Sequence, residues 1–221
     1  MTQFDFHAAR LAMVEGQLRT NAVTDSRVLD AFGAVPRERF VPEALRGVAC
    51  IDEDLPLGGG RWLIEPRALA RLLQFVQIAS TDRVLVIGDP SGYAAAIVAR
   101  LAGQVTMLES DSAAAAAARQ HLAALGCANV QIVQGALERG HGPGAPYSVI
   151  VLAGAAVEVP EALRMQLLEG GRLVGVIRKP GQQMGEAEVM TSIDGVLSRR
   201  PVFDAGTPYI PGYQPTPNFA F

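Results

Sequence analysis

The fold is decided by residues 83–101, which read RVLVIGDPSGYAAAIVARL. The apolar run that ends at Ile87 has the composition of a strand buried on both faces. A turn with glycine at either end follows, from Gly88 to Gly92, and the alanine-rich stretch from Tyr93 favours a helix. A strand, a glycine turn and a helix in this order predict the first unit of an open α/β sheet.

The same alternation continues along the chain and predicts a Rossmann-like, doubly wound, mostly parallel sheet. A helix begins after the capping residues Ser110 to Ser112 and ends at Gly126. Another helix is expected at 160–168, and a closing hairpin turns at Asp194 and Gly195. The strands expected after the first are 105–108, 129–133, 148–152, 172–177, 188–193 and 195–200.

One domain spanning 1–221 is expected, because no linker or internal repeat interrupts the pattern. Its three parts are a preface of helices and loops at 1–78, a sheet core at 79–206 and a tail rich in proline and aromatic residues at 207–221.

Within the preface, helical spacing of apolar residues predicts a helix over 5–21, and Asp25 is the expected N-cap of the next helix. The run LPLGGG at 55–60 predicts a glycine-rich loop, and a helix begins at Pro66. Trp62, between these two features, either stacks on a ligand or plugs the crevice, and the bulky Ile64 nearby favours the plug.

The composition excludes several classes of function. The chain has 221 residues, 49% hydrophobic and 19% charged, with a net charge of −3. No basic stripe suits nucleic acid, and no apolar run reaches the roughly 18 residues that span a membrane. No secretion signal is recognised, so a cytoplasmic location is expected. Cys50 and Cys127 are expected to be free thiols, and the few histidines predict no metal site.

The glycine turn and one acidic residue suggest a cofactor site. In an open α/β sheet the turn after the first strand faces the ligand crevice, and glycine lets the backbone approach a ligand closely. Glu109 ends the next strand, where a carboxylate accepts hydrogen bonds from ribose hydroxyls. The alternatives stay open: Gly88 and Gly92 serve only the turn, or Glu109 only caps a helix.

The turn also contains Pro90, which has no N–H and places a ring where a ligand would come close. Asp89 beside it either pairs with an ammonium group of a ligand or caps the following helix.

Several segments in order resemble the protein-L-isoaspartate O-methyltransferase family. The resemblance runs from about Met13 to Val176. The segments that carry it are MVEGQLR at 13–19, VPRERFVP at 35–42, LPLGGG at 55–60, VLVIGDPSGYAAAIVARL at 84–101 and LLEGGRLV at 167–174. Among them, the motifs VPRERFVP and LPLGGG of the preface are the more specific to this family.

The resemblance implies a class I methyltransferase fold and S-adenosylmethionine as cofactor. It also implies methylation of a protein or peptide substrate that carries a damaged, isoaspartyl residue. The substrate carboxylate is ionised at neutral pH, so this chemistry needs no general base. The residues that the resemblance assigns to cofactor binding are Gly88, Asp89, Ser91, Gly92, Tyr93, Glu109 and Gly135.

Other family positions differ in this chain. Where the family has T-I-S-Q-P, this chain reads WLIEP, with Ile64 at the serine position, so no catalytic residue is assigned. Val86 and Ala136 replace acidic residues, Pro90 replaces a glycine, and Ser148 replaces an aspartate. Each lost hydrogen bond removes roughly 1 to 3 kcal/mol of binding free energy, which predicts a weakened cofactor site.

Three functions follow from these observations. The first is a methyltransferase of the isoaspartyl type, and the second is a non-catalytic relative that keeps the fold as a binding or regulatory module. The third, an NAD-dependent oxidoreductase, explains the glycine turn and Glu109 but not the preface. In the tail, the aromatic residues dock on their own domain or mediate self-association; they are Tyr209, Tyr213, Phe219 and Phe221.

Overall fold

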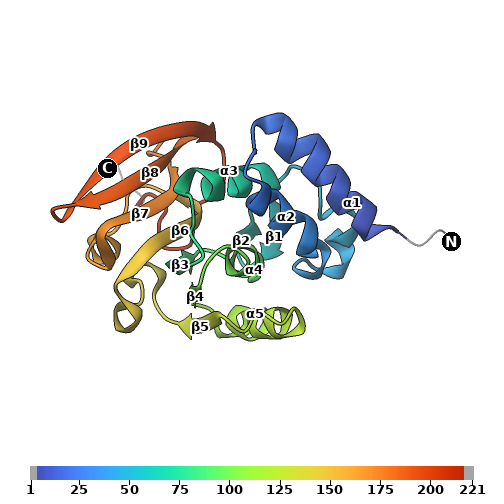
Figure 1. The fold of residues 1–221 in the computed structure, drawn as a ribbon, viewed down its shortest axis with the longest axis horizontal. Helices are drawn as coiled ribbons and strands as arrows, with labels where there is room; N and C mark the ends of the chain where they lie inside the picture. Colours follow the sequence, from blue (N-terminus) through green and yellow to red (C-terminus); the bar gives the residue numbers. More distant parts are fainter. Residues whose placement is uncertain (1–3, 217–221) are drawn as a thin grey trace, which may run out of the picture.

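A computed structural model describes residues 4–216 (Figure 1). A seven-stranded sheet forms the centre, in the order β5-β4-β3-β6-β7-β8-β9. The first five strands of this order are parallel, and β8 and β9 add an antiparallel edge. The strands are β3 (Arg83–Ile87), β4 (Gln104–Glu109), β5 (Val130–Gln134), β6 (Tyr147–Ala156), β7 (Leu167–Ile177), β8 (Gly185–Ile193) and β9 (Val196–Ala205). The predicted mostly parallel sheet is confirmed.

Strand β3, which lies inside the sheet, shows why the apolar run was decisive. Val84 and Val86 of β3 pack into a core on one face of the sheet, whereas Leu85 and Ile87 pack into a second core on the other face. A parallel strand is covered on both sides by its crossover connections, so a continuous apolar sequence is what it requires.

The two faces of the sheet are covered differently. The first core is formed with the preface, which includes α3 (Pro66–Val76), and with the helices α4 (Tyr93–Ala99) and α5 (Ser112–Ala124). Within residues 4–216, the second face is covered by the four-residue α6 (Glu161–Arg164) and 3-10 turns, so part of its core comes from the tail, through Ile210 and Tyr213.

The preface begins with α1 (Phe6–Met13), which continues through a π-helical turn to Leu18 and a 3-10 turn to Asn21. The predicted helix over 5–21 is therefore present as three joined helical segments. The helix α2 (Ser26–Ala34) follows, and the predicted cap is confirmed, because the Asp25 side chain accepts a hydrogen bond from the Arg27 amide. Two 3-10 turns, Arg37–Arg39 and Glu43–Val48, complete this part.

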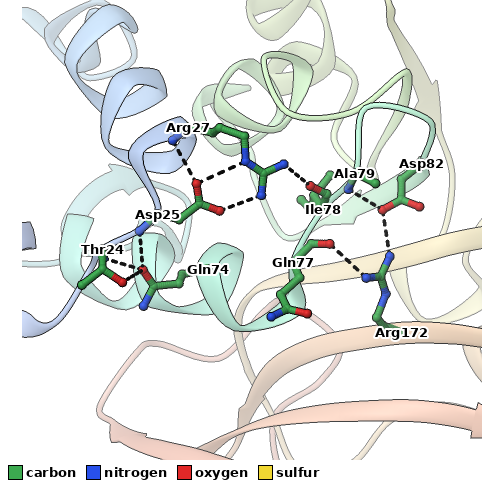
Figure 2. A network of polar contacts seen from close by, with 9 residues as sticks. All are labelled: Thr24, Asp25, Arg27, Gln74, Gln77, Ile78, Ala79, Asp82 and Arg172. Carbon is green, nitrogen blue, oxygen red and sulfur yellow. Dashed lines mark hydrogen bonds and ion pairs between the residues drawn. The ribbon is translucent and has the colours of Figure 1, made fainter.

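A polar network ties the preface to the sheet (Figure 2). Gln74 near the end of α3 accepts hydrogen bonds from the amides of Thr24 and Asp25, at 2.6 and 2.9 Å. On the other side, Arg172 of β7 donates to the Gln77 carbonyl and pairs with Asp82. The end of α3 is thus held between α2 and β7.

Two expectations about elements are wrong. The LPLGGG segment is not a simple loop, because β1 (Leu55–Gly58) pairs antiparallel with β2 (Arg61–Leu63). Three successive glycines with positive φ, at 58–60, allow this tight turn. The helix expected at 160–168 ends at Arg164, because Leu167 and Leu168 already belong to β7.

The closing hairpin has the predicted turn. Asp194 and Gly195 have φ values of 51° and 76°, as a two-residue hairpin turn of the primed type requires. Cys50 and Cys127 are both free and half-buried. Within residues 4–216, no helix combines the length and the apolar character needed to cross a bilayer.

Candidate functional site

The candidate site lies where the order of strand addition in the sheet reverses, between β3 and β6. The chain adds β4 and β5 on one side of β3 and then returns to place β6 on the other side. In open α/β sheets, ligands bind beyond the carboxyl ends of the two strands at such a switch point. Here those ends carry Gly88, after β3, and Gly154, within the last residues of β6.

The turn from Gly88 to Gly92 is held in place by its backbone conformation and by hydrogen bonds to Asp89. Both glycines have positive φ, 85° and 86°, a conformation that other residues adopt only with strain. The Asp89 carboxylate accepts hydrogen bonds from the amides of Gly92 and Ala95 and from the Ser91 hydroxyl. Both of its oxygens therefore serve the start of α4, and burial raises the pKa of Asp89 to about 6. The structure favours the capping interpretation of Asp89.

Tyr93 lies on the wrong side of the turn for a side-chain contact with a ligand in the crevice. Its ring is fully buried in the preface, with ring centroids 6.1 Å from Phe32 and 5.4 Å from Phe40. The Arg37 guanidinium lies 4.8 Å from the Tyr93 ring centre. As the first residue of α4, its side chain points toward the helical layer. The Tyr93 side chain is thus used in the helical layer, and the expectation that Tyr93 belongs to the cofactor site stays a prediction.

Glu109 is at the carboxyl end of β4, as expected, and is fully buried. One carboxylate oxygen, Oε1, accepts a hydrogen bond from the Asp111 amide at 2.8 Å and forms an ion pair with Arg61. Arg61 also donates to the Ser110 hydroxyl. The other oxygen, Oε2, is buried and has no hydrogen-bond partner within the described residues. Glu109 thus keeps one acceptor that no described residue uses, and the expectation that it binds ribose hydroxyls stays a prediction.

Sequence reasoning missed Arg61. Its only signal is its position directly after the glycines of LPLGGG, and the ion pair depends on the β1–β2 hairpin folding over the end of β4. A loop without pairing would not have fixed that placement.

The remaining expected positions are spread out. Gly135 follows β5, and its amide donates to the Glu109 carbonyl at 3.0 Å, so it lies beside Glu109. Val86 is fully buried in the core. Ser148 lies at the opening of β6, where its hydroxyl bonds the backbone of Arg83. Because that is the amino end of the parallel strands, Ser148 lies away from the crevice.

The tail folds into the crevice. Thr207 to Tyr213, named here the strap, forms a parallel bridge between Tyr209 and Ala155 of β6. The Ala155 amide donates to the Pro208 carbonyl at 2.8 Å, and the Ile210 amide donates to the Ala155 carbonyl at 2.9 Å. The described part of the tail therefore docks on its own domain, which is the first of the two expected alternatives; Phe219 and Phe221 lie outside the described residues.

Ile210 is the centre of the strap. Only 2% of its surface is exposed, and a Cβ placed on Gly88 would lie 2.7 Å from Ile210 Cγ1. A Cβ on Gly154 would lie 2.8 Å from the same atom. The space that the missing side chains of both glycines leave is therefore occupied by Ile210. Trp62, by contrast, is 38% exposed and lines a small cavity together with Ile210. The interpretation of Trp62 as a plug stays a prediction.

Two cavities of different size border this region. The cavity enclosed by the strap, Gly88, Ile64 and Trp62 has a volume of about 10 Å³, which is about the least that holds one water. The neighbouring cavity measures about 470 Å³ and runs from the β1–β2 hairpin to the start of α5. Arg61 and Pro90 line both cavities and form the wall between them.

Comparison with known proteins identifies the family. The family model described as protein-L-isoaspartate(D-aspartate) O-methyltransferase (PCMT) matches residues 9–203. The chain belongs to this family. A relative named protein-L-isoaspartate O-methyltransferase 1, from Rhodopseudomonas palustris, is 46% identical over 169 residues, which cover 76% of this chain and 69% of the relative. A relative named protein-L-isoaspartate O-methyltransferase, from Methylorubrum extorquens, is 43% identical and covers 79% of this chain and 76% of the relative.

Solved structures agree with the family fold. One named protein-L-isoaspartate O-methyltransferase superposes with a TM-score of 0.78 at 26% identity, covering 90% of this chain and 64% of that one. This chain therefore spans just under two thirds of that structure's chain. A Plasmodium falciparum protein whose name carries the abbreviation PCMT, solved with S-adenosyl-L-homocysteine, gives a TM-score of 0.77 at 18% identity. It covers 91% of this chain and 97% of its own. The family resemblance and the class I methyltransferase fold are confirmed.

The segment at the family's serine position is held by a buried arginine. Arg37, from the VPRERFVP motif, donates to the carbonyls of Ala49 and Ile64, both at 2.7 Å. Ile64 is buried and lines the small cavity. The methyltransferase family's preface motif thus fixes the backbone of WLIEP, while the side chain at the serine position is apolar.

The crevice fits the family's cofactor only in part. The free oxygen of Glu109 and the two glycines of the turn are suitable for a nucleoside. The space beside Gly88, however, is filled by Ile210, and Arg61 covers Glu109. The cavity left beside Gly88 measures about 10 Å³, which is too small for a nucleoside. The predicted weakening of cofactor binding by the substituted residues stays a prediction.

Proposed function

We propose that this protein is an S-adenosylmethionine-dependent methyltransferase that methylates carboxylates of isoaspartyl residues in proteins or peptides. The observation that carries the proposal is the family match over residues 9–203, which includes both the preface and the sheet. A nucleotide-binding sheet alone would suit many enzymes, whereas the preface is absent from generic methyltransferases.

Within this function, we assign Gly88, Gly92 and Gly135 to the backbone frame of the cofactor site, and Glu109 to the ribose hydroxyls. Ser91 and Asp89 support the site indirectly, because their polar atoms hold the start of α4. No side chain is assigned as a general base, since a carboxylate with a pKa near 4 is already ionised at neutral pH. The protein contributes mainly alignment of the reacting groups.

The direct test is methyl transfer to a defined peptide. A peptide with one isoaspartyl residue and its matched peptide with ordinary aspartate are incubated with labelled S-adenosylmethionine and the full chain. Label in the isoaspartyl peptide alone supports the proposal. Label in neither peptide, at high enzyme concentration and with a known family member as positive control, would overturn it.

The non-catalytic alternative has no support in the comparisons, since the named relatives are methyltransferases. A cytoplasmic location and the absence of nucleic-acid partners remain part of the proposal and follow from the composition. Self-association through the tail also stays a prediction. The intramolecular docking of residues 207–213 makes it less necessary for burying Ile210 and Tyr213.

A further inference from the structure

The strap occupies the switch point of the sheet. Strand β3 pairs with β6 as far as Ile87 and Leu152, and there β3 ends at the glycine turn. Beyond that point, the strap pairs with Ala155 of β6, on the edge that β3 has left free. A segment of the chain thus lies where an open α/β sheet binds its ligand.

The contacts of the strap are those that a ligand would make. Ile210 packs against the backbones of Gly88 and Gly154, the two places where a ligand can approach most closely. The backbone of Ala155, which faces the crevice, gives both its N–H and its carbonyl to the strap. About 10 Å³ remains between the strap and the glycine turn. A sulfonium nucleoside therefore cannot enter this part of the crevice while the strap is docked.

Three features of the strap favour its release from the crevice. Its backbone makes two hydrogen bonds with Ala155 of β6, and its Tyr213 carbonyl accepts one from the amide of Val157, directly after β6. The Thr207 hydroxyl is buried without a hydrogen-bond partner in the described structure, which disfavours the docked state. Glycines at 206 and 212, the latter with φ of 87°, lie at its two ends and can absorb a change of direction.

The strap lies beyond residues 9–203, the part of the chain that the family model matches. We infer that the strap is an autoinhibitory segment of this chain, which competes with S-adenosylmethionine for the crevice and must swing out before the cofactor binds. This inference rests on the proposed function, since it takes the family's cofactor as the competing ligand.

Loosening the strap should therefore tighten cofactor binding. The full chain is titrated with S-adenosylhomocysteine by calorimetry, as wild type and as the variants Ile210→Ala and Tyr213→Phe. Ile210→Ala removes the side chain that fills the crevice, and the dissociation constant should fall by about tenfold or more because the open fraction rises. Tyr213→Phe removes only the hydrogen bond to the Leu137 carbonyl, outside the small cavity, and should tighten binding about two- to fivefold.

The matched control is Ile193→Ala, the same substitution at an exposed residue at the end of β8. It should leave the affinity at the wild-type value. Thermal melting shows that each variant is folded. If Ile210→Ala does not fold, the affinity of Tyr213→Phe and the hydrogen exchange of the wild-type chain still test the strap inference.

Hydrogen exchange observes the strap directly, whether or not the protein is active. The Ile210 amide, which donates to the Ala155 carbonyl, should be protected in the free chain and should exchange faster when S-adenosylhomocysteine is added. Unchanged protection during saturable binding, with equal affinities for wild type and Ile210→Ala, would overturn the strap inference. The proposed function would then still stand on the methyl-transfer assay.

No binding by any of the chains would also overturn the strap inference, since opening the crevice would then admit nothing. The methyl-transfer assay on the isoaspartyl peptide decides separately whether the proposed function fails with it.

Discussion

The two ends of the crevice are closed in different ways. At the acidic end, the buried Glu109 is covered by one arginine that reaches over from the β1–β2 hairpin, and a cavity of about 470 Å³ lies beside it. At the glycine end, Gly88 and Gly154 are packed by Ile210, and about 10 Å³ remains. The acidic end is closed by a charge pair and the glycine end by apolar packing.

The difference teaches which closure is easier to reverse. Arg61 can leave Glu109 by rotating its own side chain toward water, and its side chain is already 18% exposed. Ile210 can leave only if the strap moves as a unit, because its backbone is hydrogen-bonded to β6. The strap, rather than Arg61, is therefore the slower barrier to a ligand.

The largest effect is expected from Gly88→Ala at the glycine end. A methyl group there combines left-handed backbone strain with a contact of 2.7 Å to Ile210. Together these should lower the unfolding free energy by roughly 2 to 5 kcal/mol. Denaturant unfolding of Gly88→Ala, Ile210→Ala and the double variant measures how much of the lost unfolding free energy comes from the contact between the new methyl group and Ile210. Strictly additive losses would show that Ile210 does not press on Gly88.

The next effect is a pH dependence in the turn that joins the two ends. Burial raises the pKa of Asp89 to about 6 in the folded chain, against about 3.9 unfolded. The folded state therefore binds this proton more tightly. The resulting stabilisation is complete below about pH 4 and is lost as the pH rises through 6, by up to about 3 kcal/mol.

Unfolding of wild type and Asp89→Asn between pH 4 and 7 checks this dependence. The wild type should lose more stability across the window than the variant. Asp54→Asn is the matched control, because burial also raises the pKa of Asp54 to about 6. It should remove the contribution of Asp54 and leave that of Asp89. Parallel curves for wild type and Asp89→Asn would contradict the prediction.

At the acidic end, Arg61→Ala should lower the unfolding free energy by about 3 kcal/mol, because it leaves the buried carboxylate of Glu109 without its partner charge. Arg199→Ala breaks an ion pair with Glu188 in which the arginine is half exposed, so it should cost less than about 1 kcal/mol. Urea unfolding of both variants compares them. Equal losses would mean that Glu109 is not stabilised by Arg61.

The smallest effects are expected from the two tyrosine hydroxyls of the strap. Tyr213→Phe removes a buried hydrogen bond to the Leu137 carbonyl and should destabilise the chain by about 1 kcal/mol. Tyr209→Phe removes a part-buried bond to the Arg178 carbonyl and should destabilise it by less. Thermal melting ranks the two. The reverse order would show that the strap is anchored at its outer edge.

The sequence by itself determined the sheet, its glycine turn and the family. These features are local: the apolar run before Gly88, the cap at Asp25 and the turn at Asp194 depend on neighbours in the chain. Glu109 could be placed for the same reason, because the end of a parallel strand fixes the edge of the sheet on which it lies.

Tertiary structure decided what fills the crevice. Arg61 reaches Glu109 across 48 positions in the sequence, and Ile210 reaches Gly88 only because the strap returns along β6. Tyr93 stands beside the glycine turn in sequence, but its helix points the ring into the preface. Contacts between distant segments depend on packing geometry, which the order of residues along one strand or helix does not contain.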